Sequence, residues 1–521
     1  MNNLSENKLV LTITFMFAVV ITASIIYQNS VHLILGHSAR DVFFYLIEAL
    51  RFSGTSIGGY EYVNYLSPFI PFLTSLLFRA GFISQTSIFI TSGVFFIFGI
   101  LAMFYILKLR FNNFYSCFGA FLYGTLYINI TWVGNGTLDI AFISILLGAL
   151  YFFIKAVEDS QKFFYIAFPL AVISFFTKYP GALVIPLMGL YFISKGNVKY
   201  NIEKYYKNMI GGFIAGIITA IPFLAYFTLN KIPLGFINQA NEISSTSSLS
   251  ATHNGQLIGN DIFFYIKGLI YDISSTNYII GIIILAITLI GFVFLVLRFK
   301  NTIRNYTPLY ISIFMIIISF LTAGLFSFIF SEAILFLGLI LFAWSYKKVN
   351  PKYNAALSIT MFALYLGYLV FFTSHLTKAD RYFTSMAPGF IFITVLSIES
   401  LMSRKIKLTK YLIPIMIFLM LISAANHIIS IDDDSLAVSE NNVAKWLEGK
   451  SGIIASDRAP VYTWYLEKEV TYIQDLSNST LINERLLDND TVYYIGINNV
   501  NLDNYSQVKA IDKSKIYKVN N

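Results

Sequence analysis

Long apolar runs, separated by short polar segments, fill the first 430 or so residues of the chain. A helix of about 20 such residues crosses the hydrocarbon core of a bilayer. The first run, Leu9 to Tyr27, has no small-x-small cleavage motif, which favours a retained span over a signal peptide. The sequence therefore predicts about thirteen membrane spans, the others near 84–107, 114–133, 139–157, 163–177, 180–194, 208–228, 277–297, 307–325, 328–346, 355–373, 382–402 and 410–427.

The pattern changes after residue 428, where three aspartates open a polar stretch that runs to the end of the chain. Val438 to Glu448 has the spacing of an amphipathic helix, and short β-like runs follow it. We predict a transmembrane domain at 1–428 and a small extracytoplasmic α/β domain at 429–521. The first carries long outer loops at 28–83 and 229–276. The predicted strands lie near 452–455, 470–473, 492–497 and 516–519.

The composition agrees with a membrane protein. Hydrophobic residues make up 56% of the chain and charged residues only 12%, against about 25% charged in an average soluble domain. These values exclude an ordinary water-soluble enzyme and also a disordered chain. The single cysteine, Cys117, rules out an intrachain disulfide and a cysteine-based metal site.

The net charge of +8 reflects where the basic residues lie. If the N-terminus is cytoplasmic, the short inner loops hold most of the lysines and arginines, as in the segment between Lys195 and Lys207. This is the positive-inside bias of membrane proteins. It predicts a multi-pass protein of the plasma membrane with its C-terminal domain outside, and membrane lipid rather than nucleic acid as its surroundings.

The first outer loop holds two candidate segments. Gly36 to Glu48 has helical spacing typical of a helix on the membrane surface, with Asp41 and Tyr45 on one face. The Asp41 carboxylate either stabilises the helix N-terminus or acts as a general base. The second segment, 60–71, contains acidic and aromatic residues that either wall a sugar-sized pocket or form an interfacial aromatic belt.

Three further charges lie at the outer ends of predicted spans. Asp139 follows the tight turn GNGT, where a helix N-cap alone would explain a carboxylate. Lys178 separates two apolar runs, and it either snorkels to the interface or binds a phosphate as a point charge. Arg381 either pairs with Asp380 or clamps a phosphate through its guanidinium fork.

Together these residues place an acid, tyrosines and cations on one face of one membrane. A carboxylate can take the proton of an acceptor hydroxyl, and cations stabilise a leaving phosphate as its charge develops. The combination suits transfer from a sugar–phosphate donor. No Gly-rich nucleotide loop or nucleophile elbow supports another chemistry.

At this point the sequence resembles the GT-C class of membrane glycosyltransferases. It is most similar to glycosyltransferase family 39, which includes protein O-mannosyltransferases and lipid A aminoarabinose transferases, and to the RgtA/B/C/D-like domain. The resemblance covers residues 9–400 or so. It is carried by RDVFFYL at 40–46, LSPFIPFLTSLLF at 66–78, GTLDIAF at 136–142, FFTKYPGALVIP at 175–186 and DRYFTSMAP at 380–388.

The resemblance implies roles for particular residues. The first-loop acid of the family falls on Asp41 and its second acid on Asp139, which would be the catalytic residues. The family's tyrosine falls on Tyr45 and its phosphate-contacting lysine on Lys178. It implies an inverting transfer from a polyprenyl-phosphate sugar to a lipid, glycan or protein acceptor. Arg381 would be a second phosphate ligand. The substrate pocket would be lined by His37, Arg40, Tyr45, Glu61 and Tyr65.

One position departs from the family. Protein O-mannosyltransferases have two adjacent acids in the first loop, whereas here the neighbour of Asp41 is Arg40. This counts against protein mannosylation and leaves no carboxylate pair there for a divalent metal. We predict no metal and no cofactor; a divalent metal is compatible with the chemistry but has no support in the sequence.

Two alternative functions stay open. An oligosaccharyltransferase would share the span count, but its outer domain usually carries a Trp-Trp-Asp type motif, and the tail here has only Trp446 and Trp464. A lipid-linked sugar flippase or transporter would need charged residues near the membrane midplane, whereas most of the charges here lie at outer ends.

Overall fold

The computed structural model describes residues 2–35, 40–55, 67–229, 261–303, 306–323, 325, 328–349, 355–374, 378–403, 411–473, 479–497 and 502–520. Contacts divide the chain into two compact units. Unit 1 contains residues 1–25, 92–133 and 138–429, and unit 2 contains residues 26–91, 134–137 and 430–521. Each unit is described by itself.

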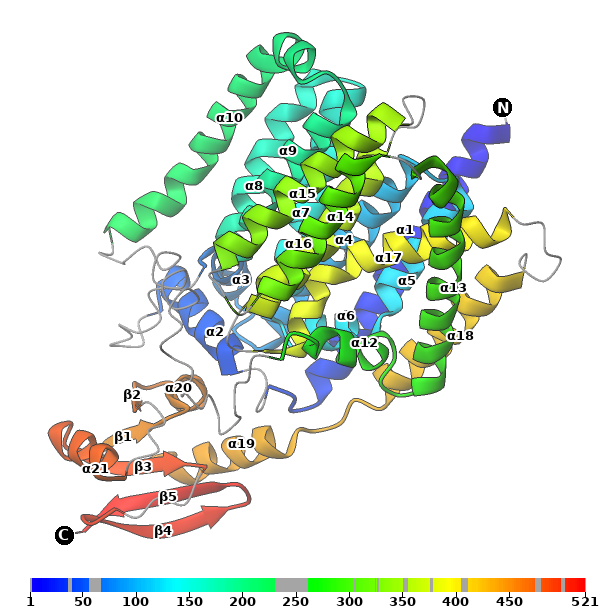
Figure 1. The fold of residues 1–521 in the computed structure, drawn as a ribbon. Helices are drawn as coiled ribbons and strands as arrows, with labels where there is room; N and C mark the ends of the chain where they lie inside the picture. The colour runs from blue at the N-terminus through cyan, green and yellow to red at the C-terminus, as the bar shows by residue number, and fades with distance from the viewer. Residues whose placement is uncertain are drawn as a thin grey trace. The chain divides into compact units, whose positions relative to one another are not determined.

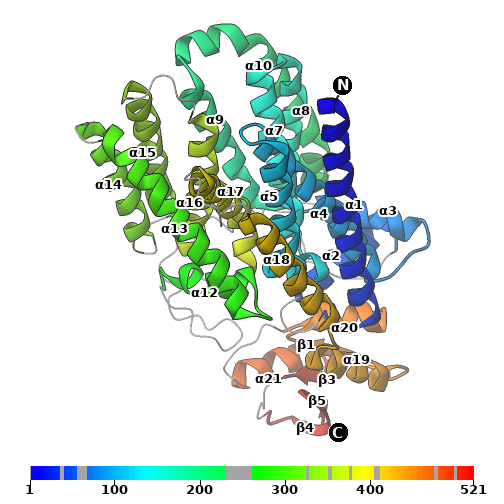
Figure 2. The same ribbon diagram turned by 90° about the vertical axis from the view of Figure 1, so that its right-hand side faces the viewer.

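Every predicted apolar run is helical, because long unbroken stretches of apolar side chains satisfy their backbone groups within a helix. The helices are visible in Figure 1 and Figure 2. They are α1 (Asn2–Val31), α4 (Thr86–Lys108), α5 (Asn113–Thr125), α6 (Tyr127–Gly134), α7 (Leu138–Glu158), α8 (Phe164–Thr177), α9 (Val184–Lys195), α10 (Val198–Leu229), α13 (Tyr278–Ile303), α14 (Thr307–Thr322), α15 (Phe328–Val349), α16 (Ala356–Ser374), α17 (Phe383–Met402) and α18 (Leu412–Ile429).

Among the described residues, nine helices are long and apolar enough to cross a membrane. The runs predicted at 114–133, 163–177, 180–194 and 307–325 form shorter helices. The first of them is broken at Leu126, whose extended backbone ends α5 before α6 begins. The polytopic α-helical class is therefore confirmed, whereas a count of thirteen spans stays a prediction.

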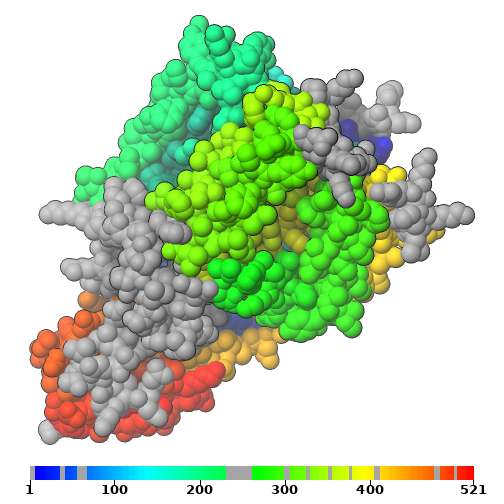
Figure 3. Space-filling view, viewed as in Figure 1, coloured from blue at the N-terminus to red at the C-terminus, as the bar shows by residue number. Residues whose placement is uncertain are grey.

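Large apolar side chains cover much of the surface of unit 1. On α13, α14 and α15, exposed residues include Ile282, Leu289, Phe314, Ile317 and Leu337. Figure 3 shows α13 and the α14–α15 pair on one face, with α17 visible between them. A continuous apolar surface of this kind is costly in water, and it is the surface that lipid chains cover in a membrane-embedded bundle.

The C-terminal part of unit 2 is a five-stranded sheet with helices, in the strand order β2-β1-β3-β5-β4. The pairs β1–β2 and β1–β3 are parallel, and β3–β5 and β5–β4 are antiparallel. The elements are α19 (Ser435–Leu447), β1 (Ile453–Ser456), α20 (Ala459–Leu466), β2 (Thr471–Tyr472), α21 (Ser479–Asp488), β3 (Thr491–Gly496), β4 (Tyr505–Ile511) and β5 (Ser514–Val519).

The small α/β domain predicted from the sequence is confirmed. Its first helix and four of its strands fall where the alternating pattern places them. The sequence pattern missed β4, because five consecutive residues of this edge strand are exposed and so lack the apolar alternation of a half-buried strand. It also missed α20 and α21, which are only 8 and 10 residues long.

The C-terminal elements pack on segments from the first part of the chain within unit 2. Helix α20 contacts α2 (Arg40–Ser53), which also packs on α3 (Phe69–Arg79). The rings of Phe43 and Tyr465 lie 5.7 Å apart, and Gln85 donates a hydrogen bond of 3.2 Å to the Tyr465 hydroxyl. The helix that carries Asp41 and the C-terminal domain therefore form one compact unit.

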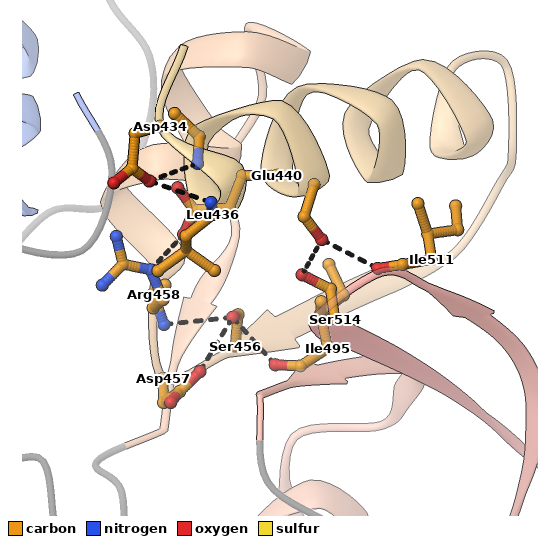
Figure 4. Close-up of polar contacts among 11 residues, drawn as sticks. Asp434, Leu436, Glu440, Ser456, Asp457, Arg458, Ile495, Ile511 and Ser514 are labelled. Carbon is orange, nitrogen blue, oxygen red and sulfur yellow. Dashed lines mark hydrogen bonds and ion pairs between the residues drawn. The ribbon is translucent and has the colours of Figure 1, made fainter. Parts of the chain in front are cut away.

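A buried ion pair joins α19 to the turn after β1. Glu440 accepts a hydrogen bond from Arg458 Nε, and both side chains are almost completely buried (Figure 4). Ser456, at the end of β1, accepts from the Arg458 backbone N–H at 3.0 Å and donates to the Ile495 carbonyl at 2.9 Å. The pair thus connects the helix to the centre of the sheet.

We expect Arg458→Met to destabilise the C-terminal domain by about 3–5 kcal/mol, because the Glu440 carboxylate would stay buried without its cation. Hydrogen exchange of α19 and β1 peptides in the full-length protein measures this loss. The double change Glu440→Gln with Arg458→Met removes both charges and should recover most of the protection. Wild-type exchange rates in the single variant would contradict the prediction.

Candidate functional site

The turn before α7 fixes the start of the helix that carries Asp139. Gly136 has φ +67°, in the left-handed region that favours glycine. A Cβ on Gly134 would overlap the side-chain amide of Asn29, so a larger residue here would require that side chain to move. Asp139, the second residue of α7, follows directly and is 1% exposed. Its carboxylate is therefore buried at a helix N-terminus, where the helix dipole favours negative charge.

Lys178 lies at a break between two helices. Its backbone is extended between the end of α8 and the short 3-10 helix η4 (Tyr179–Leu183), in which Pro180 follows. Gly181 packs directly against the backbone of Ser174, where a Cβ would come within 2.5 Å of the carbonyl oxygen. This tight break projects Lys178 toward α7, and its Nζ lies 2.5 Å from Oδ1 of Asp139.

Arg381 lies in another short 3-10 helix, η6 (Asp380–Tyr382), directly before α17. The Tyr382 ring has two cationic neighbours: Lys178 Nζ is 5.0 Å from its centroid and Arg381 Cζ is 5.4 Å from it. Tyr382 stacks on Phe372 of α16 at 4.3 Å. Arg381 Cζ also lies 6.0 Å from the Trp132 ring. Unit 1 thus brings Asp139, Lys178 and Arg381 to one site around Tyr382.

This arrangement can bind an anion. The aromatic rings hold both cations through cation–π contacts, and Asp139 neutralises part of the lysine charge when no anion is present. No sequence motif marks Trp132 as a site residue. Tyr382 lies within the stretch DRYFTSMAP, but it is not predicted as a site residue, since aromatic side chains at span ends are common in membrane proteins. They became recognisable only once the chain breaks before η4 and η6 had brought separate helices together.

Asp41 and Tyr45 lie in unit 2, on the predicted helix α2. Tyr45 is buried, and every residue from 43 to 50 is buried as well. Helices α3 and α20 pack against α2. Arg40 is the first residue of α2, and its side chain lies outside the described part of the structure. His37, Glu61 and Tyr65 also lie outside the described residues.

One group of metal-ligating side chains lies together in the part of the chain that the structure describes. His32, Asp432 and Asp433 of unit 2 have ligand atoms within 4.8 Å of one another. His32 Nδ1 is 3.2 Å from Asp433 Oδ1, which also accepts the Leu33 backbone N–H at 2.8 Å. Both aspartates are exposed, and the ion pair and hydrogen bonds already account for the cluster as a link between the end of α1 and the start of α19.

The comparison with known families shows that part of the chain resembles a family of membrane glycosyltransferases. Residues 66–226 match the family model described as dolichyl-phosphate-mannose-protein mannosyltransferase. This segment includes Asp139 and Lys178. The resemblance predicted from the sequence is therefore confirmed, and it supports a transferase.

Among solved structures, the chain is similar to crystal structures of ArnT from Cupriavidus metallidurans. The form bound to undecaprenyl phosphate aligns with a TM-score of 0.59 and 11% identity, over 96% of this chain and 97% of that one. The apo form aligns with a TM-score of 0.58 and 10% identity over the same shares. No curated protein matches the chain significantly. At these identities the structural likeness shows a shared fold.

Proposed function

We propose that this protein transfers a sugar from a polyprenyl-phosphate carrier to an acceptor at the outer face of the membrane. The observation that carries the proposal is the pairing of Lys178 with buried Asp139 beside Arg381, around the Tyr382 ring. Two comparisons support a lipid-phosphate ligand. The description of the matched family names a dolichyl-phosphate sugar, and the ArnT structure contains bound undecaprenyl phosphate.

In this proposal Asp41 accepts the proton of the acceptor nucleophile while that group attacks the anomeric carbon of the donor sugar. The bond between the anomeric carbon and the phosphate oxygen breaks, and the configuration inverts. The leaving polyprenyl phosphate gains negative charge, which Lys178 and Arg381 stabilise. Asp139 pairs with Lys178 and neutralises part of the lysine charge when no donor is bound. The acceptor is a lipid, a glycan or a protein.

The transfer assay uses the full-length protein in liposomes with a panel of polyprenyl-phosphate sugars. Mass spectrometry follows the release of polyprenyl phosphate and the growth of the acceptor. Release that depends on the protein and on an acceptor supports the proposal. Movement of the lipid-linked sugar across the bilayer without release would instead favour a flippase or transporter.

Lys195→Ala provides a matched control for Lys178→Ala. Lys195 pairs with Glu158 at the C-terminal end of α7, as Lys178 pairs with Asp139 at its N-terminal end. Each change removes the lysine of an ion pair whose acidic partner lies on α7. Only the loss of Lys178 should weaken binding of undecaprenyl phosphate. Equal effects would show that the lysines serve the fold alone.

A further inference from the structure

A second buried carboxyl lies near this site on a segment that sequence motifs do not identify. Asp272 is on α12 (Phe264–Ile273) and is 2% exposed. It shares the buried face of that helix with Tyr265, Leu269 and Ile273. Its Oδ1 has no hydrogen-bond partner among the described residues. An ionised carboxylate in such a position costs free energy. The carboxyl group is therefore either neutral or paired with a bound ligand.

The groups that face Asp272 do not neutralise a negative charge. Helix α12 packs against α13, α16 and η6. Of the charged side chains on these elements, Asp380 of η6 acts on Asp272. The charge of Asp272 also interacts with the hydroxyl groups of Tyr265 of α12 and Tyr365 of α16. Burial, with a smaller contribution from Asp380, raises the pKa of Asp272 to about 8.

The neighbour Asp380 connects this carboxyl to the anion site. Asp380 precedes Arg381 in η6, and its charge interacts with those of Arg381 and Asp139. A negative charge on Asp272 would therefore add to the acidic charge beside the two cations, and it would oppose a phosphate bound there. A neutral Asp272 adds no negative charge beside the two cations and can itself donate a hydrogen bond.

We propose that Asp272 is a positioning residue of the donor site, which stays the neutral acid while the anionic donor is bound and weakens donor binding when it ionises. The inference rests on the proposed function, since it concerns the same phosphate site. It makes donor binding and proton binding reciprocal: each favours the other. The residue acts through η6 and need not touch the donor.

Donor affinity should therefore fall as the pH rises. Below about pH 8 Asp272 is protonated and affinity is full. Above it, affinity falls by up to about tenfold per pH unit, because one proton must be taken up on binding. The second ionisation of a phosphate monoester, with a pKa of about 6, is complete at pH 8 and does not contribute.

Lys378 is a second group that titrates in this range. It donates hydrogen bonds to the carbonyls of Phe372 and Thr373, and burial lowers its pKa to about 8. Its deprotonation would also weaken anion binding above pH 8. Lys378→Arg keeps the positive charge throughout and so separates the two contributions.

The experiment measures the dissociation constant of undecaprenyl phosphate from pH 7 to pH 9.5 in the full-length protein. In a Lys378→Arg background, affinity should fall about ten- to thirtyfold over this range. Adding Asp272→Asn should keep the affinity at pH 7 and abolish the fall, because the amide does not ionise. A fall that persists unchanged in the Asp272→Asn variant would overturn the inference.

A second variant keeps the test independent of how well Asp272→Asn folds. Asp380→Asn removes the acidic neighbour, so Asp272 should ionise at lower pH and the loss of affinity should begin earlier. An unchanged midpoint would count against the inference. Failure of the proposed function gives a different result, because undecaprenyl phosphate would then bind at no pH, or bind equally well to Lys178→Ala.

Discussion

Replacing Asp41 by Asn should reduce sugar transfer by about 10²–10⁴-fold, the range that general-base catalysis supplies. The amide has nearly the same shape as the carboxylate but cannot accept the proton of the acceptor. Because Asp41 would not bind the donor phosphate, the affinity for undecaprenyl phosphate should stay within a few-fold of the wild type. The expected signature is therefore a loss in kcat without a loss in donor binding.

The measurement compares turnover and lipid binding in the same preparation. Asp432→Asn is the matched control: it removes an exposed carboxylate from the same unit, and activity should not change. Asp41→Glu keeps a carboxylate and should retain more activity than the amide. Full turnover with Asp41→Asn would show that Asp41 is not the general base. Helix α2 would then serve only to pack against α3 and α20.

The sequence predicts best what depends on local pattern. The apolar runs are helices because a bilayer-spanning segment needs internal hydrogen bonds, and Lys178 lies between two helices where the run is interrupted. In the C-terminal domain, strands with buried alternating residues such as β3 were predictable. The exposed β4 was not, since its place in the sheet depends on pairing with β5 rather than on its own side chains.

The sequence predicts least where distant segments meet. Asp139 and Lys178 were separate candidates, and the structure joins them in an ion pair that no spacing rule would indicate. The packing of α20 on α2 is similar: apolar periodicity marks the buried faces, but not the partner that buries them. Asp272 had a readable signal, because it interrupts the apolar face of α12 at helical spacing from Tyr265 and Leu269.

Replacing Lys178 by Ala should weaken binding of undecaprenyl phosphate by about 10- to 150-fold, corresponding to the roughly 1.5–3 kcal/mol of a hydrogen bond to a charged group. Two effects contribute. The donor phosphate loses a cationic ligand, and the buried Asp139 carboxylate loses the partner that neutralises it. Breaking a buried pair from one side also costs about 3–5 kcal/mol of stability, which thermal unfolding of the variant should show.

Asp139→Asn separates the two effects. Alone, it releases Lys178 from its ion pair and should leave donor affinity within a few-fold of the wild type. Combined with Lys178→Ala, it removes the unpaired buried charge, so stability should recover while the phosphate still lacks its ligand. Donor affinity should thus rank wild type and Asp139→Asn first, the double variant next and Lys178→Ala last. If the double variant bound the lipid as tightly as the wild type, Lys178 would serve only to neutralise Asp139, and Arg381 would be the phosphate ligand.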